Sequence, residues 1–164
     1  KEFTNGVGEF TVNIALIADG SPVLGVIYAP ALDLMYWAYA GGGAWREAQG
    51  ESVRVYATRR AAGEPRVVVE SRSHPSPDLE TFLSTIDVAR RVGVGSSLKF
   101  CWLADGQADL YARFGPTMEW DVAAGDCIYR NSARTGQRPT TFRYNTETCR
   151  VPNFVLGLED DIRV

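Results

Sequence analysis

The beginning of the chain consists of short apolar runs separated by turn residues, a pattern typical of β-strands. The runs lie at residues 12–18, 23–28, 34–39, 53–56 and 67–70. The first two are rich in β-branched side chains and are joined by Asp19-Gly20-Ser21-Pro22, so we expect them to form an antiparallel hairpin. Three glycines at 41–43 have no helix start after them, and they predict a turn rather than a phosphate-binding loop.

Farther along the chain, strands alternate with helices. Ser76 and Pro77, followed by acidic residues, are typical of a helix start, and this helix is expected to run to about Ile86. Further helices are predicted over 97–104 and from Asp121 to about Arg130, with strands at 91–94, 109–113 and 154–158. The alternation indicates a layered α/β architecture. A length of 164 residues with 45% hydrophobic content suffices for one domain or a large part of one.

The charge balance narrows the class of partner. There are 17 basic and 20 acidic residues, so no global positive charge attracts a nucleic-acid polymer or an anionic membrane, and we expect a small-molecule partner. The sequence contains no visible signal peptide or transmembrane run. Of the three cysteines, Cys101 and Cys127 lie in apolar helical contexts, which favours reduced, buried thiols in a cytoplasmic protein.

Three charged residues in the second half of the chain suggest a metal-assisted phosphate site. Asp121 opens a predicted helix, where its carboxylate either ligates a hard cation such as Mg²⁺ or simply caps the helix. Lys99 and Arg113 carry the cations that bind phosphates, although such residues are usually ordinary surface side chains. Lys99 lies in the otherwise apolar run 98–102, which would mostly be buried, so a cation there needs a reason.

The single histidine, His74, follows the strand predicted at 67–70. Loops after strands commonly carry ligand contacts in open α/β sheets, so His74 is a candidate binding residue, although a lone histidine is often a bystander. Arg72, two residues earlier, either assists it or forms an exposed salt bridge.

Several segments carry a more specific signal when they are taken in order. They are Lys1-Glu2-Phe3, Gly8-Glu9-Phe10-Thr11-Val12-Asn13-Ile14-Ala15-Leu16-Ile17, Gly25-Val26-Ile27-Tyr28-Ala29-Pro30, Gly41-Gly42-Gly43-Ala44-Trp45 and Trp120-Asp121-Val122-Ala123-Ala124-Gly125. Together they resemble the inositol monophosphatase superfamily. The resemblance implies an α-β-α-β-α sandwich whose N-terminal portion is missing here, with central-sheet strands in 1–60 and the C-terminal α/β part in 61–164. Within the superfamily, Ser71-Arg72-Ser73-His74 resembles the 3'(2'),5'-bisphosphate nucleotidases, in which this segment borders the adenine pocket.

The resemblance also implies a reaction and roles for residues. The family's nucleotidases are Mg²⁺-dependent hydrolases that remove the 3'-phosphate of adenosine 3',5'-bisphosphate to give AMP. By resemblance, Asp121 is a catalytic metal ligand close to the scissile phosphate. Ser96, Lys99 and Arg113 are implied to contact the substrate phosphates, and Ser97 replaces Ser96 if the register is shifted by one residue.

The resemblance further implies that Lys1-Glu2-Phe3 ends the family's first metal motif. The other Mg²⁺ ligands are then expected in the absent N-terminal part, and the 164-residue chain as written is expected to be inactive. We also expect the apolar strand surface from Val12 to Ile17 to be uncovered. Two alternatives stay open: an inositol- or sugar-phosphate phosphatase of the same fold, and a non-catalytic fragment or binding module. Whether the protein forms a homodimer is left open.

Overall fold

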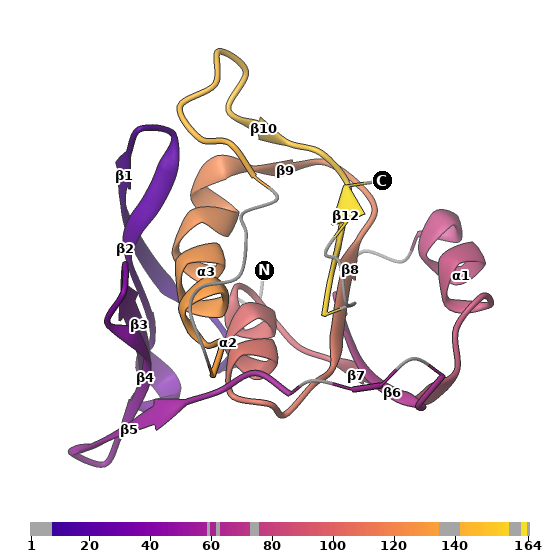
Figure 1. Cartoon of the computed structure of the whole chain (residues 1–164), viewed down its shortest axis with the longest axis horizontal. Coiled ribbons are helices and arrows are strands. Elements are labelled where there is room, and N and C mark those ends of the chain that lie inside the picture. Colours follow the sequence, from indigo (N-terminus) through magenta and orange to yellow (C-terminus); the bar gives the residue numbers. More distant parts are fainter. Residues whose placement is uncertain are drawn as a thin grey trace.

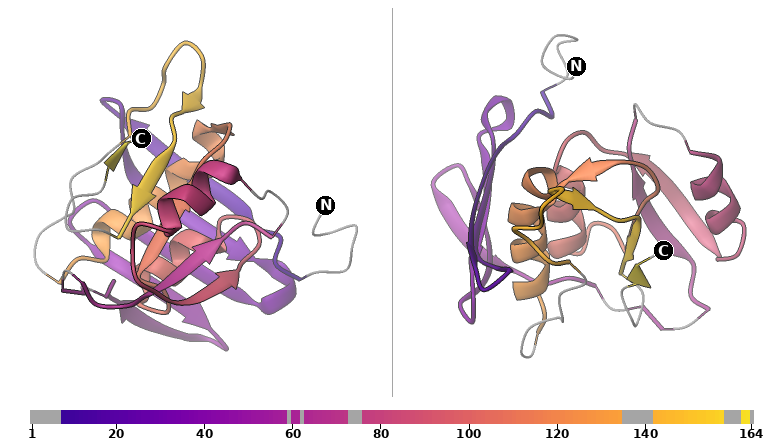
Figure 2. Two further views of the ribbon diagram at one scale, coloured as in Figure 1. Left: turned by 90° about the vertical axis from the view of Figure 1, so that its right-hand side faces the viewer. Right: turned by 90° about the horizontal axis from the view of Figure 1, so that it is seen from above.

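The computed structural model describes residues 8–58, 60–61, 63–72, 76–134, 142–157 and 162–163. These residues form layers in the order sheet, helices, sheet, helix (Figure 1). The same order is visible from above in the right-hand view of Figure 2. The predicted layered α/β class is therefore confirmed.

The first sheet is antiparallel, with the strand order β1-β2-β3-β4-β5. Its strands are β1 Val12–Ala18, β2 Ser21–Ala29, β3 Leu34–Tyr39, β4 Gly43–Ala48 and β5 Glu51–Val55, with the 3₁₀ helix η1 Pro30–Leu32 between β2 and β3. Side chains alternate between the two faces. Ile27 and Tyr36 on one face are buried, whereas Ile14 and Leu16 on the other are each 59% exposed. The expected uncovered strand surface is thus present among the described residues.

Helices α2 Leu98–Ala104 and α3 Glu119–Asn131 lie between the two sheets. The α3 helix packs on β1 to β4 and against α2, which in turn contacts the second sheet. Gly125 sits so close to Phe100 of α2 that a Cβ atom at position 125 would lie 2.3 Å from the Phe100 ring. Only glycine therefore permits this spacing between the helices.

The second sheet is mixed, with the strand order β12-β11-β8-β6-β7. Its strands are β6 Arg66–Glu70, β7 Val88–Gly93, β8 Leu110–Arg113, β11 Phe154–Leu156 and β12 Ile162–Arg163, and β9 Thr117–Met118 pairs separately with β10 Arg150–Val151. β6 runs parallel to both β7 and β8. Helix α1 Pro77–Leu83 covers the outer face, where Leu79 and Leu83 pack in one cluster with Val68 of β6.

Several predicted elements are confirmed. The first two strands form the antiparallel hairpin, and the glycines at 41–43 form a turn that leads into β4. Cys101 and Cys127 are free and buried, as expected. Among the described residues, no helix is both long and apolar enough to cross a membrane.

Several elements differ from the prediction. The first helix ends at Leu83 rather than near Ile86, because the Ser84 and Thr85 hydroxyls donate to backbone carbonyls and so compete with the helix. The last helix begins at Glu119, so Asp121 is its third residue rather than its first. Strand β4 was not predicted, and it forms because it pairs with a strand on each side.

Candidate functional site

The described candidate residues lie on the second sheet and on the helices beside it. Because β6, β7 and β8 run parallel, they end at the same edge of that sheet, where α/β proteins commonly bind ligands. Ser96 follows β7, and Arg113 is the last residue of β8. His74 lies outside the described residues.

Tyr111 brings three of the predicted residues together. The Lys99 Nζ atom lies 5.7 Å from the centre of the Tyr111 ring. Burial raises the pKa of the Tyr111 hydroxyl, while Arg113 lowers that pKa and Asp121 raises it, so both charges act on this hydroxyl. Tyr111 was not proposed as a site residue. Its position two residues before Arg113 in a strand places both side chains on one face, and that spacing is readable from the sequence.

Lys99 is only 5% exposed, and its ammonium group bonds to the loop that precedes α2. Nζ donates hydrogen bonds to the carbonyl oxygens of Val94 at 3.0 Å and Ser96 at 2.6 Å. The burial of Lys99 agrees with its place in an apolar run, and these two carbonyls offset the cost of burying its charge. Lys99 therefore holds the 94–97 loop, and its contact with a substrate phosphate stays a prediction.

Ser96 and Ser97, which the sequence left as alternatives, differ in exposure. Ser97 is buried, and its Oγ lies 2.6 Å from Asn13 Oδ1 and 2.8 Å from Thr11 Oγ1. Ser96 is half-buried, and its Oγ lies 2.6 Å from Thr11 Oγ1. Ser96 is thus the serine whose side chain a ligand can reach more easily.

Arg113 is half-buried at the carboxyl end of β8. Its Nη2 donates to the Pro116 carbonyl at 3.2 Å. Its Nε is buried and has no hydrogen-bond partner among the described residues. Buried donors are normally paired, so an unpaired N–H on a guanidinium is a feature that a bound anion would satisfy.

Asp121 lies on the first turn of α3 and is exposed. Its Oδ2 accepts a hydrogen bond from the Met118 amide at 3.3 Å, so Asp121 helps to close the helix start from the third helical position, while Met118 rather than Asp121 is the N-cap. No group of three or more His, Cys, Asp or Glu in the described part of the chain is placed to hold a metal. Because Mg²⁺ is held by several oxygen ligands, the described residues do not by themselves form a magnesium site.

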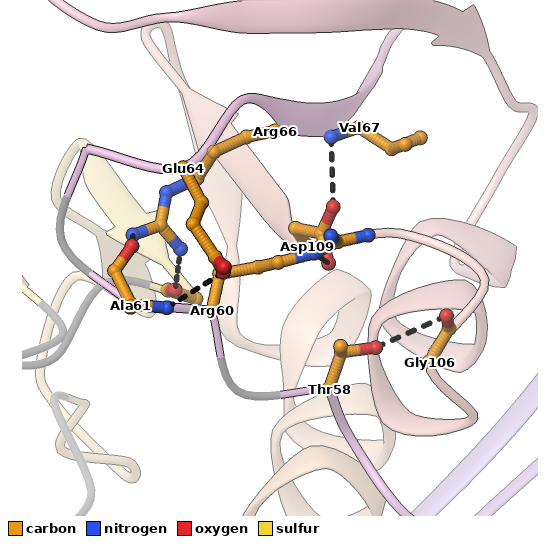
Figure 3. A network of polar contacts seen from close by, with 9 residues as sticks. Thr58, Arg60, Ala61, Glu64, Arg66, Val67, Gly106 and Asp109 are labelled. Carbon is orange, nitrogen blue, oxygen red and sulfur yellow. Dashed lines mark hydrogen bonds and ion pairs between the residues drawn. The ribbon is translucent and has the colours of Figure 1, made fainter.

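Other buried carboxylates near this region have structural partners. Asp109 accepts hydrogen bonds from the Val67 amide at 2.8 Å and from Arg60 Nε at 3.0 Å (Figure 3). Glu119 accepts from the hydroxyl of Thr146 and from the amides of Thr146 and Asn145. Burial opposes ionisation of Glu119, but these bonds together outweigh it and hold the Glu119 pKa below its ordinary value.

Arg72 forms a salt bridge with Glu9, with Nη2 and Oε1 2.8 Å apart. This is the second of the two roles that the sequence suggested for Arg72. The same carboxylate accepts a hydrogen bond from the Gly95 amide at 2.6 Å. Glu9 thus connects the segment after β6 with the loop after β7, a contact that the sequence analysis did not foresee.

A pocket of about 410 Å³ lies beside the chain segment that follows Arg113. It is lined by Ser76, Asp78, Phe114, Gly115, Pro116, Thr117, Arg150, Val151, Pro152 and Asn153. The Gly115 amide donates to Asn153 Oδ1 at 2.9 Å and ties two of its walls together. The volume is in the range of small-molecule pockets.

Comparison with known proteins identifies the class. A model of the inositol monophosphatase family matches residues 1–132, and the chain belongs to that family. The chain is 54% identical over 128 residues to the 3'(2'),5'-bisphosphate nucleotidase CysQ of Salmonella typhimurium. It is 52% identical over the same number of residues to CysQ of Escherichia coli K12. Each alignment covers 78% of this chain.

The fold is that of the same family. The crystal structure of CysQ from Bacteroides thetaiotaomicron superposes with a TM-score of 0.77 and 36% identity, covering 94% of this chain and 64% of that protein. The chain spans about half the length of the curated relatives that it matches.

Proposed function

We propose that the protein is a Mg²⁺-dependent phosphomonoesterase of the 3'(2'),5'-bisphosphate nucleotidase type, which removes the 3'-phosphate of adenosine 3',5'-bisphosphate to give AMP. The chain would be the C-terminal portion of a single phosphatase fold, with central-sheet strands in 1–60 and the remaining α/β part in 61–164. The relatives called 3'(2'),5'-bisphosphate nucleotidase support this proposal, at 52–54% identity over the matched residues.

One observation carries the proposal: the guanidinium of Arg113 has a buried, unpaired Nε at the end of β8. A phosphate oxygen is a strong acceptor for such a donor. The Lys99 ammonium lies over the ring of Tyr111, two residues before Arg113 on the same strand, and its charge favours an anion in that region. Arg113 and Lys99 would therefore be contacts of a substrate phosphate, and Ser96 would be a further substrate contact.

Asp121 would act as a metal ligand next to the phosphate. When bound, Mg²⁺ would activate a water molecule and offset negative charge on the phosphate. Other oxygen ligands are needed for such an ion, and none is grouped with Asp121 among the described residues. This supports a second candidate for the 164 residues by themselves, a binding module without catalysis.

The remaining part of the substrate would occupy the pocket beside residues 114–117, the segment that follows Arg113. Its volume of about 410 Å³ suits a small molecule, and Ser76, which lines it, is two residues from His74. By resemblance, His74 would stack on the adenine. We expect His74→Ala to weaken binding of the nucleotide substrate by about 1 to 3 kcal/mol. Binding of inositol monophosphate should be affected much less.

The net charge of −3 supports a small-molecule substrate rather than a nucleic-acid polymer or a membrane surface. The free, buried thiols of Cys101 and Cys127 are compatible with the cytoplasm, where the proposed enzyme would work, with sulfur metabolism as its setting. A homodimer stays possible for this enzyme.

Phosphate release tests the proposal in the protein as its gene encodes it. With Mg²⁺, adenosine 3',5'-bisphosphate should be hydrolysed faster than inositol monophosphate. Arg113→Lys keeps the positive charge but loses the planar guanidinium and its Nε–H donor, so kcat/KM should fall about 10- to 100-fold. Arg90→Lys, an exposed position on β7, serves as the matched control and should leave the rate unchanged.

Each other outcome has a definite meaning. Faster hydrolysis of inositol monophosphate would favour the inositol-phosphate phosphatase. Absence of turnover for both substrates would favour the non-catalytic module. An Arg113→Lys rate equal to that of Arg90→Lys would remove Arg113 from the substrate contacts.

A further inference from the structure

Three polar side chains at alternate positions, Glu9, Thr11 and Asn13, lead into and begin β1, and we call them the polar ladder. They bond in order to three successive residues of the 94–97 loop. Glu9 Oε2 lies 2.6 Å from the Gly95 amide, Thr11 Oγ1 lies 2.6 Å from Ser96 Oγ, and Asn13 Oδ1 lies 2.6 Å from Ser97 Oγ. Residues at alternate positions of an extended chain point to the same side, so one segment can hold the whole loop.

The 94–97 loop has a conformation that needs such support. Ser96 has a φ of 51°, in the left-handed region that is costly for a residue other than glycine. Lys99 holds the loop from within α2, through the carbonyls of Val94 and Ser96. The polar ladder holds the loop from the other side, from the segment that leads into and begins β1 of the first sheet. Ser96 is therefore fixed between two elements that are far apart in the sequence.

The contact between Glu9 and Gly95 depends on the absence of a side chain. A Cβ atom at position 95 would lie 2.8 Å from the Glu9 Cβ and 2.9 Å from its Oε2. Any larger residue would thus push the carboxylate away from the amide. The close approach indicates that this contact is a specific feature of the fold rather than a chance surface bond.

The hydroxyl groups of the polar ladder form a chain with a direction. Each hydroxyl has a single proton to donate. Ser97 donates its proton to Asn13 Oδ1, so Thr11 must donate to Ser97, and Ser96 must in turn donate to Thr11. Ser96 Oγ then has only lone pairs to offer to a ligand. It can accept a hydrogen bond from a hydroxyl or amino group, but it cannot donate one to a phosphate oxygen.

We infer that the polar ladder is a positioning device that fixes the 94–97 loop and orients Ser96 Oγ as an acceptor for a hydroxyl or amino group of the substrate. Thr11 acts through Ser96 and is a positioning residue. Ser96 determines specificity for the part of the substrate that carries donors, while the phosphate is left to Arg113 and to the charge of Lys99. This inference rests on the proposed function for the identity of the substrate.

Kinetics in the protein as its gene encodes it test the position of the loop. Thr11→Val removes the hydroxyl and keeps the shape, so the KM for adenosine 3',5'-bisphosphate should rise about 3- to 10-fold, with kcat changed less than about twofold. Thr11→Ser restores the hydroxyl and should restore KM. Thr81→Val on α1, whose hydroxyl donates to Pro77, is the matched control and should change neither constant.

The direction of the hydroxyl chain has its own test. Ser96→Ala should raise the KM for the nucleotide and leave the inhibition constant of inorganic phosphate unchanged, because Ser96 does not donate to phosphate. Arg113→Lys should weaken phosphate inhibition about 10-fold or more. If Ser96→Ala weakens phosphate inhibition as much as Arg113→Lys does, Ser96 is a phosphate donor and the inferred direction is wrong.

Amide hydrogen exchange separates this inference from the proposed function. In Thr11→Val, exchange of the Gly95 amide should become about 10-fold faster or more, while the amides of 154–156 in β11 exchange at the wild-type rate. An inactive wild-type protein would overturn the proposed function, and the exchange result would still decide whether the polar ladder holds the loop. Unchanged exchange at Gly95 in Thr11→Val would overturn the inference, whatever the activity.

Discussion

The clearest quantitative prediction concerns Asp109, which joins the segment between the sheets to the second sheet (Figure 3). Its side chain is only 3% exposed, and each carboxylate oxygen has one partner. Oδ2 accepts from the Val67 amide at 2.8 Å and Oδ1 from Arg60 Nε at 3.0 Å. Asp109→Asn keeps the shape but leaves one oxygen for two donors.

The cost follows from which bond is lost. The Asn oxygen can serve either Val67 or Arg60, and the new NH₂ group then faces the other donor, so we expect a loss of about 1.5–3 kcal/mol in the free energy of unfolding. For a chain of this size, that loss lowers Tm by about 3–12 °C. Arg60 is 41% exposed, so Arg60→Gln is the matched control and should cost clearly less than Asp109→Asn.

Urea unfolding followed by tryptophan fluorescence measures both variants, with equal m-values as the sign that only stability has changed. An Asp109→Asn loss no larger than that of Arg60→Gln would refute the reasoning, because the buried amide of Val67 would then not depend on the carboxylate.

Three further predictions concern packing, chemistry and thiol reactivity. Gly125→Ala forces a Cβ into the Phe100 ring and should lower the free energy of unfolding by about 1–3 kcal/mol in the same urea assay. Asp121→Asn should lower Mg²⁺-dependent phosphate release by the gene-encoded protein about 10²- to 10³-fold, and near-full activity would show that Asp121 is only a helix-start residue. Burial raises the pKa of the Cys127 thiol to about 12, so a disulfide reagent at pH 8 should modify half-buried Cys149 rapidly and the two buried thiols only after unfolding, and rapid modification of all three would contradict the packing.

The uncovered face of the first sheet yields one more expectation, which concerns the 164 residues by themselves. Val12, Ile14 and Leu16 are all more than half exposed. Such a surface favours association, so we expect this chain to self-associate in sedimentation experiments. Ile14→Lys should shift it towards the monomer, and a monomeric wild-type chain would contradict the expectation.

Local sequence signals were sufficient for much of the fold. The apolar runs and the Asp19-Gly20-Ser21-Pro22 turn determine the first hairpin, since strand preference and turn chemistry both act over a few residues. Pro77 set the start of α1 for the same reason. Lys99 was recognisable as a cation in an apolar run, although its two carbonyl partners are seen only in the folded chain.

The tertiary structure alone decided which residues meet. Strand β8 lies between β6 and β11, and that order depends on pairing between segments that no local pattern connects. The hydroxyl groups of Ser96 and Ser97 bond to Thr11 and Asn13, which lie more than 80 residues earlier in the chain. Composition and spacing describe neighbours along the chain, whereas hydrogen bonds and burial depend on neighbours in space. The sequence therefore determined the candidate residues, and the folded chain determined how they are held.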